Sequence, residues 1–336
     1  MTARFSVLAG LLLVMAAGPV LASASDGLVI YSGRSDALVK PVLEKFTERT
    51  GIPVTVHSGS STELLNKLRL EGARTQADLY MSNDAGSLQL GAGAGVFSAL
   101  PAELLAETPA NYRGPDNTWV GLSARARVLV VNTDSPLASQ VSSVFELAGE
   151  ALEGRVAITN SANESFIAGV TVYMEAAGEE VTRDWLRGLR RNAAGNVYAR
   201  HRSIVSDVAA GRREVGLVNH YYVARHLADN PDAPIRMVIP DQGEGETGVA
   251  WNVAGVAIAR HSDKQEAALK LVEFLLSRQG QAVFAATNNE YPTRPGVPVA
   301  EGLPATESLR VADVPMSVLG PRRSATLDMI EAAGMP

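Results

Sequence analysis

The chain has 336 residues, a formal net charge of −6 and no cysteine. Without cysteine there is no disulfide, no thiol nucleophile and no thiolate ligand, so a bound metal would need oxygen or imidazole ligands. The acidic balance, with no long run of Lys and Arg, argues against a nucleic-acid partner, because phosphate binding needs a basic footprint.

The first residues match a cleaved secretory signal. Arg4 precedes an apolar run over residues 5–14, and Gly18 and Pro19 precede the small residues 22–24, which fit a signal-peptidase site. The apolar run is shorter than the roughly 20 residues that a membrane-spanning helix needs. We therefore predict that residues 1–24 are a signal peptide and that the exported mature chain starts near Ser25.

Strand and helix patterns then alternate along the chain, which favours an α/β architecture with largely parallel sheets. Strands are expected at residues 27–31, 54–56, 77–81, 128–132, 155–158, 214–218, 235–239 and 251–259, and helices from residue 35, from the capping box 60–63, and at 165–177, 179–189 and 264–276.

No low-complexity linker separates the two halves, so we expect two lobes with doubly wound sheets, joined by crossing strands that act as a hinge. The N-terminal lobe is assigned to residues 25–125 plus about 253–300, and the C-terminal lobe to about 126–252 plus 301–336.

The most informative cluster is Asn219-His220-Tyr221-Tyr222, which follows the strand expected at residues 214–218. Doubly wound sheets bind ligands at the carboxyl ends of their strands. Two phenols there would present two hard oxygen donors, and phenolate suits a hard trivalent cation. The alternative is that both tyrosines pack against the sheet with their hydroxyls at the surface, and the dipeptide alone favours this alternative. Their position at a strand end narrows the difference between the two interpretations.

Three further residues are candidates for the same cleft. Arg125 and Arg127 stand two apart at a strand start, so at least one could face the cleft and hold an anion by a bidentate contact; the alternative is a pair of solvated charges. His201 precedes a helix and could also face the cleft. The glycine pattern at residues 243–248 leads into a strand, whereas a dinucleotide-binding loop must open a helix, so we interpret it as a mobile loop.

Several segments together resemble the periplasmic ferric-ion-binding family of bacterial iron ABC transporters, over essentially the whole mature chain. These segments are residues 30–34, 71–73, 77–78, 119–131, 219–222, 289–292 and 331–334. The resemblance implies a two-lobed periplasmic binding protein fold whose lobes close around iron. It also implies a monomer without catalytic activity that delivers its ligand to an inner-membrane ABC permease.

The resemblance implies site residues as well. The iron-ligating tyrosine pair of the family falls on Tyr221 and Tyr222, and Tyr31 matches a tyrosine common in the family and is a further candidate. The histidine and glutamate ligands of some members fall on Ser35 and near Asn83. A third tyrosine used by other members would lie in the loop at residues 160–165, which has none.

Two phenolates leave one of the three charges of a ferric ion unmet, so a synergistic anion such as carbonate, phosphate or citrate is expected. Arginine and a helix N-terminus would hold it, and Glu164 and Asp84 are possible substitute ligands. The residues expected around the ion and the anion are Arg125, Arg127, Asn163, Ser165, Asn219, His201, Ser35 and Asn83. The alternatives are a binder of an organic anion such as a phosphonate or carboxylate and, more remotely, a secreted hydrolase with a dispersed triad.

Overall fold

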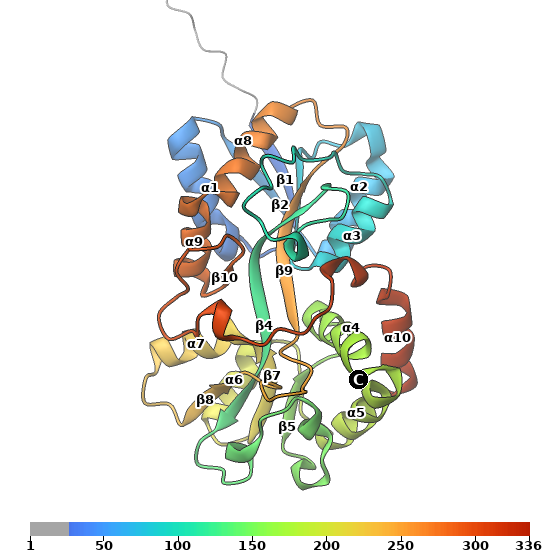
Figure 1. Cartoon of the computed structure of the whole chain (residues 1–336), viewed down its shortest axis with the longest axis vertical. Coiled ribbons are helices and arrows are strands. Elements are labelled where there is room, and N and C mark those ends of the chain that lie inside the picture. The colour runs from blue at the N-terminus through green and yellow to red at the C-terminus, as the bar shows by residue number, and fades with distance from the viewer. Residues whose placement is uncertain (1–26) are drawn as a thin grey trace, which may run out of the picture.

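The computed structural model describes residues 27–336 and shows two α/β lobes, one above the other (Figure 1). The predicted signal peptide at residues 1–24 lies outside the described residues. Two long strands run from one lobe into the other, β4 (Val120–Asn132) and β9 (Trp251–Ile258). Within residues 27–336, no helix is both long and apolar enough to span a bilayer.

The upper lobe is built on three short strands that meet β9. β1 is parallel to both β2 and β3, and β3 is antiparallel to β9. Helices cover the sheet, and two of them belong to a part of the chain that returns after β9. The elements are β1 (Leu28–Ser32), α1 (Asp36–Thr50), β2 (Val54–Ser58), α2 (Ser61–Glu71), β3 (Leu79–Ser82), α3 (Ala85–Gly93), α8 (Gln265–Leu276), α9 (Arg278–Asn288) and β10 (Tyr291–Pro292).

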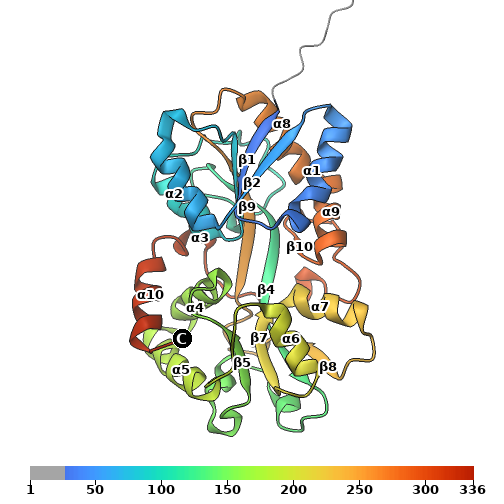
Figure 2. The ribbon, with the colours of Figure 1, turned by 180° about the vertical axis from the view of Figure 1, so that it is seen from behind.

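The lower lobe repeats the plan. β5 is parallel to β6 and β7, while β7 and β8 run antiparallel to β4. From behind, helix α10 is seen beside α4 and α5, so the end of the chain covers this lobe (Figure 2). The elements are β5 (Val156–Thr159), α4 (Glu164–Ala177), α5 (Glu179–Asn192), β6 (Val197–Tyr198), α6 (His201–Ala209), β7 (Val215–Asn219), α7 (His220–Asp229), β8 (Ile235–Val238) and α10 (Arg323–Ala332).

Strand β4 joins the two lobes, and all 13 of its residues are buried. Up to Ala126 it pairs with β9, and from Arg127 onward it pairs with β7 and β8. The sequence predicted only residues 128–132 of this strand, because Ser123, Arg125 and Arg127 interrupt the apolar pattern. These polar side chains are tolerated because they lie where the two lobes and the cleft meet rather than in the middle of a core.

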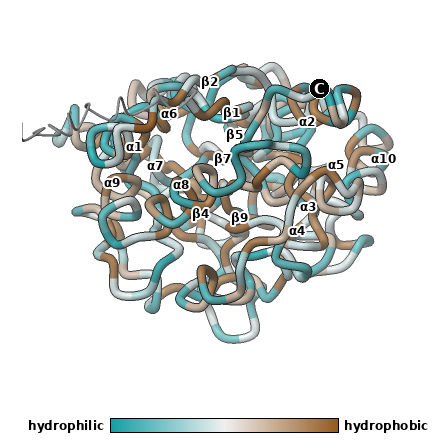
Figure 3. Tube along the Cα trace, turned by 90° about the horizontal axis from the view of Figure 1, so that it is seen from above, coloured by the Kyte–Doolittle hydropathy of each residue, from teal (hydrophilic) through white to brown (hydrophobic). Residues whose placement is uncertain are grey.

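The predicted architecture is confirmed, namely two α/β lobes with doubly wound sheets joined by crossing strands. Apolar segments run through the centre around β4 and β9 (Figure 3). Ser60 caps α2 as the sequence predicts, since its hydroxyl accepts a hydrogen bond from the Glu63 amide (3.1 Å); this is the N-cap half of the predicted capping box.

A third connection returns the chain to the lower lobe after β10. Residues 293–322 lead to α10, and Val249 and Val311 form an isolated bridge along the way. Arg322 fastens α10 by ion pairs with Glu175 of α4 and Glu179 of α5, at 2.6 and 2.7 Å. The end of the chain is thereby brought close to the cleft between the lobes.

A buried ion pair holds the upper lobe together beside the cleft. The Arg34 guanidinium, after β1, lies 2.6 Å from the Glu290 carboxylate, just before β10, and both are almost fully buried. Ser123 of β4 donates a hydrogen bond to the same carboxylate at 2.8 Å. Although burial opposes its charge, the Arg34 guanidinium and these hydrogen bonds lower the pKa of Glu290.

We predict that Glu290→Gln lowers the free energy of unfolding by about 3–5 kcal/mol, because it leaves the Arg34 charge buried without its partner. Urea unfolding followed by circular dichroism measures this loss. The matched control is Glu266→Gln, which removes a solvent-exposed pair with Lys270 and should leave the urea midpoint unchanged. Equal midpoints for the two variants would contradict the prediction.

Candidate functional site

A cavity of about 490 Å³ lies between the lobes, at the carboxyl ends of their strands. Both lobes contribute to it, and Arg125 of the crossing strand β4 lies among its walls. The lining residues predicted from the sequence are Ser35, Asn83, Arg125, Asn163, Glu164, Ser165, His201, Asn219, Tyr221 and Tyr222; the others are Gly33, Leu38, Ser60, Thr62, Ala162 and Arg323. Ten of the predicted residues, many of them far apart in sequence, thus surround one space.

The two tyrosines lie side by side in the first turn of α7, directly after β7 ends at Asn219. Their ring centroids are 4.5 Å apart, with an interplanar angle of 42°. The sequence indicated a strand end or turn here. The start of a helix explains why neighbours reach one cavity, because successive helical side chains are rotated by only about 100°, whereas strand neighbours point to opposite faces.

Asn219 connects Tyr221 to Ser165 in the first turn of α4. Its side-chain amide donates to the Tyr221 hydroxyl and to the Ser165 hydroxyl, each at 3.1 Å. Its side-chain oxygen accepts a hydrogen bond from Arg127 at 3.0 Å. Arg127 therefore lies behind Asn219 and outside the cavity lining, where it orients the amide. Burial lowers the pKa of Arg127 to about 10, so the side chain stays charged at neutral pH.

Tyr222 is protonated in the ligand-free site. Burial, together with the adjacent Tyr221, raises the pKa of Tyr222 above its ordinary value of 10.0. A metal ion bound by this oxygen must therefore displace a proton, as metal binding by protein ligands generally does.

The cavity also carries an uncompensated positive charge. Arg125 is 4% exposed, and its Nη2 atom is buried with no hydrogen-bond partner in residues 27–336. Within the described residues, neither Arg125 nor Arg127 forms an ion pair. Unpaired buried charges are costly, so the arrangement favours an anion in the cavity.

Helix N-termini reinforce this preference. Ser35, Ser60, Asn163 and Asn219 are the N-cap residues of α1, α2, α4 and α7, and all four line the cavity. The Asn163 side chain accepts hydrogen bonds from the Ser165 and Phe166 amides at 3.0 and 3.2 Å. The partial positive charges of these helix ends point toward the same space.

His201 lies at the start of α6, with its ring stacked on Tyr222 at a centroid distance of 5.1 Å. Neither ring nitrogen has a hydrogen-bond partner among the described residues. Burial and then the charges of Arg127 and Arg125 lower the pKa of His201 well below 6.5. The imidazole is therefore neutral, with both nitrogens buried at the edge of the cavity.

The two acidic candidates differ in position. Glu164 lines the cavity, and burial followed by the nearby Asp84 raises its pKa to about 7. Asp84 does not line the cavity. Its carboxylate caps α3 by accepting hydrogen bonds from the amide and the hydroxyl of Ser87, both at 2.9 Å. Of the two, only Glu164 lines the cavity.

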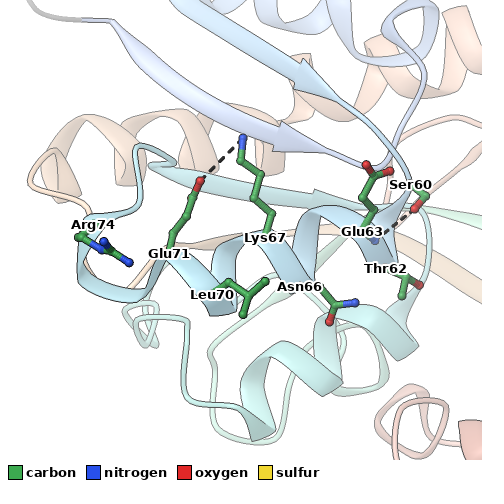
Figure 4. A pocket seen from close by; sticks show the side chains of 8 residues that line it. All are labelled: Ser60, Thr62, Glu63, Asn66, Lys67, Leu70, Glu71 and Arg74. Carbon is green, nitrogen blue, oxygen red and sulfur yellow. Dashed lines mark hydrogen bonds and ion pairs between the residues drawn. The ribbon is translucent and has the colours of Figure 1, made fainter.

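Tyr31 also lies outside the cavity lining. Its hydroxyl donates to the Glu71 carboxylate at 2.9 Å, and the Lys67 ammonium lies 4.3 Å from its ring centroid. Lys67 and Glu71 border a separate hollow of about 750 Å³ along the outer side of α2 (Figure 4). Glu71 is at the far end of α2 from Ser61, about 15 Å along the helix, so the hydroxyl of Tyr31 is directed away from the tyrosine pair.

Several lining residues had no clear signal in the sequence. In the sequence, Ser60 and Thr62 were recognised only as part of a capping box. Their position after a predicted strand could have identified them as residues of the ligand-binding edge. Arg323 could not have been found, because the third connection between the lobes brings it to the cavity from the end of the chain.

The available donors limit how the site could hold a metal. No group of three or more His, Asp or Glu side chains suited to a metal ion occurs within residues 27–336. A metal in this cavity would therefore depend on the two phenol oxygens, with Glu164, His201 and an exogenous anion as the remaining donors within reach. Apart from the His201 nitrogen these donors are oxygen atoms, which suit a hard cation.

Comparison with known proteins agrees with this architecture. The sequence profile of bacterial extracellular solute-binding proteins matches residues 28–287, most of the chain. The chain therefore belongs to the bacterial extracellular solute-binding proteins, as the resemblance in its sequence indicated.

Its relatives bear the names of iron proteins. The chain is 31% identical to iron uptake protein A1 of Synechocystis, over 91% of this chain and 86% of that one. It is 29% identical to the Fe(3+)-binding periplasmic protein of Serratia marcescens, over 90% and 88% of the two chains. A Trichodesmium structure in complex with iron and citrate superposes with a TM-score of 0.80 at 29% identity, covering 92% of this chain and all of that one.

We predict that the His201 imidazole stays neutral between pH 8 and pH 5.5 in the ligand-free protein, because protonation would place a third positive charge beside Arg125 and Arg127. Folding lowers the pKa of His201, so below the unfolded-state pKa of about 6.5 the unfolded chain binds a proton that the folded protein does not. The contribution of His201 to the free energy of unfolding is therefore present above about pH 6.5 and is lost as the pH falls below it. Imidazole NMR signals assigned with a His201→Gln variant test this. A midpoint near pH 6.5 would contradict it.

Proposed function

We propose that this protein is the periplasmic ferric-iron-binding component of an ABC importer. The observation that carries the proposal is the pair of phenols, Tyr221 and Tyr222, side by side in the cavity between the lobes. Two phenolates supply hard oxygen donors and two negative charges to a trivalent ion. The names of the relatives, which include ferric-iron-binding periplasmic proteins, support the same ligand.

An exogenous anion would fill the coordination positions that the protein's own donors leave open. Arg125, with its unpartnered buried nitrogen, and Ser165 at the N-terminus of α4 lie in the same cavity as the phenols. Carbonate, phosphate or citrate bound there would meet the third charge of the ion and relieve the buried arginine. Citrate in the Trichodesmium relative supports this class of anion.

Capture and release follow from the hinge. Residues 25–125 with about 253–300, and about 126–252 with 301–336, would move as two bodies about β4 and β9, and a ligand that contacts both favours the closed arrangement. The closed protein would present iron to an inner-membrane permease as a monomer, with no catalytic turnover and no nucleic-acid partner. Export by the predicted signal peptide would bring the chain to the periplasm.

Tyr221→Phe/Tyr222→Phe should abolish the visible absorption band of ferric phenolate and weaken ferric binding by more than about 100-fold, because both donor oxygens are lost. Visible titration with ferric citrate and competition with a chelator measure the effect.

The matched control is Tyr198→Phe, since Tyr198 lies outside the cavity and bonds to Asp207. This variant should keep the band and the affinity. Wild-type iron affinity in the double variant would overturn the assignment of the metal site.

Arg125→Met should weaken the dependence of ferric binding on added anion, because it removes the unpaired charge that the anion meets. The expected loss is roughly tenfold at saturating anion, about the value of one charge-assisted hydrogen bond. Isothermal titrations with carbonate, phosphate and citrate measure it, with exposed Arg202→Met as the control. Unchanged anion dependence would contradict the prediction.

A second candidate function is favoured by the same unpartnered Arg125 and the converging helix ends. In it, the ligand is an organic anion such as a phosphonate, a polyol phosphate or a carboxylate, without iron. Protein purified without chelators separates the two functions. A protein that stays colourless when ferric citrate is added, yet binds the organic anion, would favour this second function.

A further inference from the structure

A set of contacts beside the cavity ties helix α7 to the opposite lobe. The first is made by His220, which is fully buried directly after β7. Its Nδ1 atom accepts a hydrogen bond from the Ala126 amide at 3.2 Å. Ala126 is the residue at which β4 ceases to pair with β9, one position before β4 begins to pair with β7. The imidazole thus occupies the point where the main crossing strand changes lobes.

The other ring nitrogen reaches the upper lobe. His220 Nε2 lies 2.7 Å from the Asn289 carbonyl oxygen. Because Nδ1 accepts a hydrogen bond, the proton is on Nε2, which donates to that carbonyl. Burial lowers the pKa of His220 to about 4, in keeping with a neutral ring. A single side chain therefore joins α7 to both β4 and the end of α9.

Arg225, one turn later on α7, makes a parallel contact. Its guanidinium donates to the Asn288 carbonyl at 2.7 Å. Asn288 ends α9, and Asn289 caps it in the left-handed conformation with φ +53°. Carbonyls at a helix C-terminus lack partners within the helix and attract positive charge. Two side chains of α7 thus donate hydrogen bonds to carbonyl oxygens at the C-terminal end of α9.

The corner at residues 288–291 is itself fixed to the upper lobe. The Asn288 side chain donates to the Leu38 carbonyl of α1 at 2.9 Å. Glu290 forms the buried ion pair with Arg34, which lies between the cavity residues Gly33 and Ser35. A rigid path therefore runs from the upper wall of the cavity to the point where α7 is held.

The same two side chains of α7 also contact Tyr221. The His220 ring packs edge-on against Tyr221, with ring centroids 5.4 Å apart, and lies tilted against Tyr291, with ring centroids 4.7 Å apart. The Arg225 guanidinium lies 5.4 Å from the centroid of the Tyr221 ring. A displacement of α7 relative to α9 would therefore shift Tyr221.

We propose that His220 and Arg225 form a hinge clamp, which holds α7 on the 288–291 corner of the other lobe and so sets both the angle between the lobes and the position of Tyr221. They are positioning residues that do not touch the ligand. The proposed effect on Tyr221 matters for function only if Tyr221 and Tyr222 bind the ligand, so it rests on the proposed function. The proposed effect on the angle between the lobes does not.

The test uses distances between the lobes in the ligand-free protein. The chain has no cysteine, so Leu70→Cys on α2 and Val181→Cys on α5 can carry two spin labels; these side chains are 83% and 50% exposed. His220→Asn keeps an acceptor for Ala126 and removes the donor to Asn289, whereas Arg225→Met keeps the apolar stem. Each should broaden or shift the distance distribution measured by pulsed electron paramagnetic resonance.

The controls are His226→Asn and Arg202→Met, whose side chains form no hydrogen bond in the described part of the chain. Both should reproduce the wild-type distribution. In the labelled protein, the clamp variants should also bind ferric citrate roughly tenfold more weakly and shift the phenolate-to-iron band, which a general loss of stability would not move.

Distances in His220→Asn and Arg225→Met that match the controls would overturn the clamp. Altered distances with unchanged iron affinity and band would overturn its role at Tyr221. If the wild-type protein binds no iron, the proposed function fails, but the distances still decide whether the clamp exists. If His220→Asn does not fold, Arg225→Met still tests the clamp, because Arg225 is only half-buried.

Discussion

The site depends on positive charge that the fold buries without pairing it. Arg125 and Arg127 lie on a strand that is buried along its whole length, and neither forms an ion pair within residues 27–336. A buried arginine costs several kcal/mol unless it is compensated. The protein supplies partial compensation to Arg127 through Asn219 and leaves the buried Nη2 atom of Arg125 without a hydrogen-bond partner among residues 27–336. The anion of the proposed function would compensate this charge and so link ligand capture to lobe closure.

Burial and this positive charge together set the protonation states of the neighbouring side chains. His201 stays neutral because burial and the charges of Arg127 and Arg125 oppose its protonation. Glu164 holds its proton more tightly because burial and Asp84 outweigh Arg323 and Arg125. Burial beside Tyr221 raises the pKa of Tyr222, which therefore keeps its proton in the ligand-free cavity. A metal bound by its oxygen would have to displace that proton. The partial positive charges of the helix ends around the cavity add to the charge of the arginines.

The hinge and the site share one helix. Because α7 begins immediately after β7, the residue that contacts β4 and the upper lobe, His220, is the neighbour of the first tyrosine. The proposed clamp would couple movement of the lobes to the position of Tyr221 through a few hydrogen bonds. Opening of the cleft would then displace Tyr221.

The sequence by itself determined the α/β alternation, most element positions and the tyrosine pair, because these follow from local periodicity, capping residues and the placement of polar residues after strands. It did not determine the full length of β4, since buried Arg125 and Arg127 break the apolar pattern that marks a strand. Nor could it show that Tyr31 turns toward Glu71, that Asp84 caps α3 or that Arg323 reaches the cavity. Those facts depend on side-chain direction and on contacts between distant segments, which only the packing of the two lobes decides.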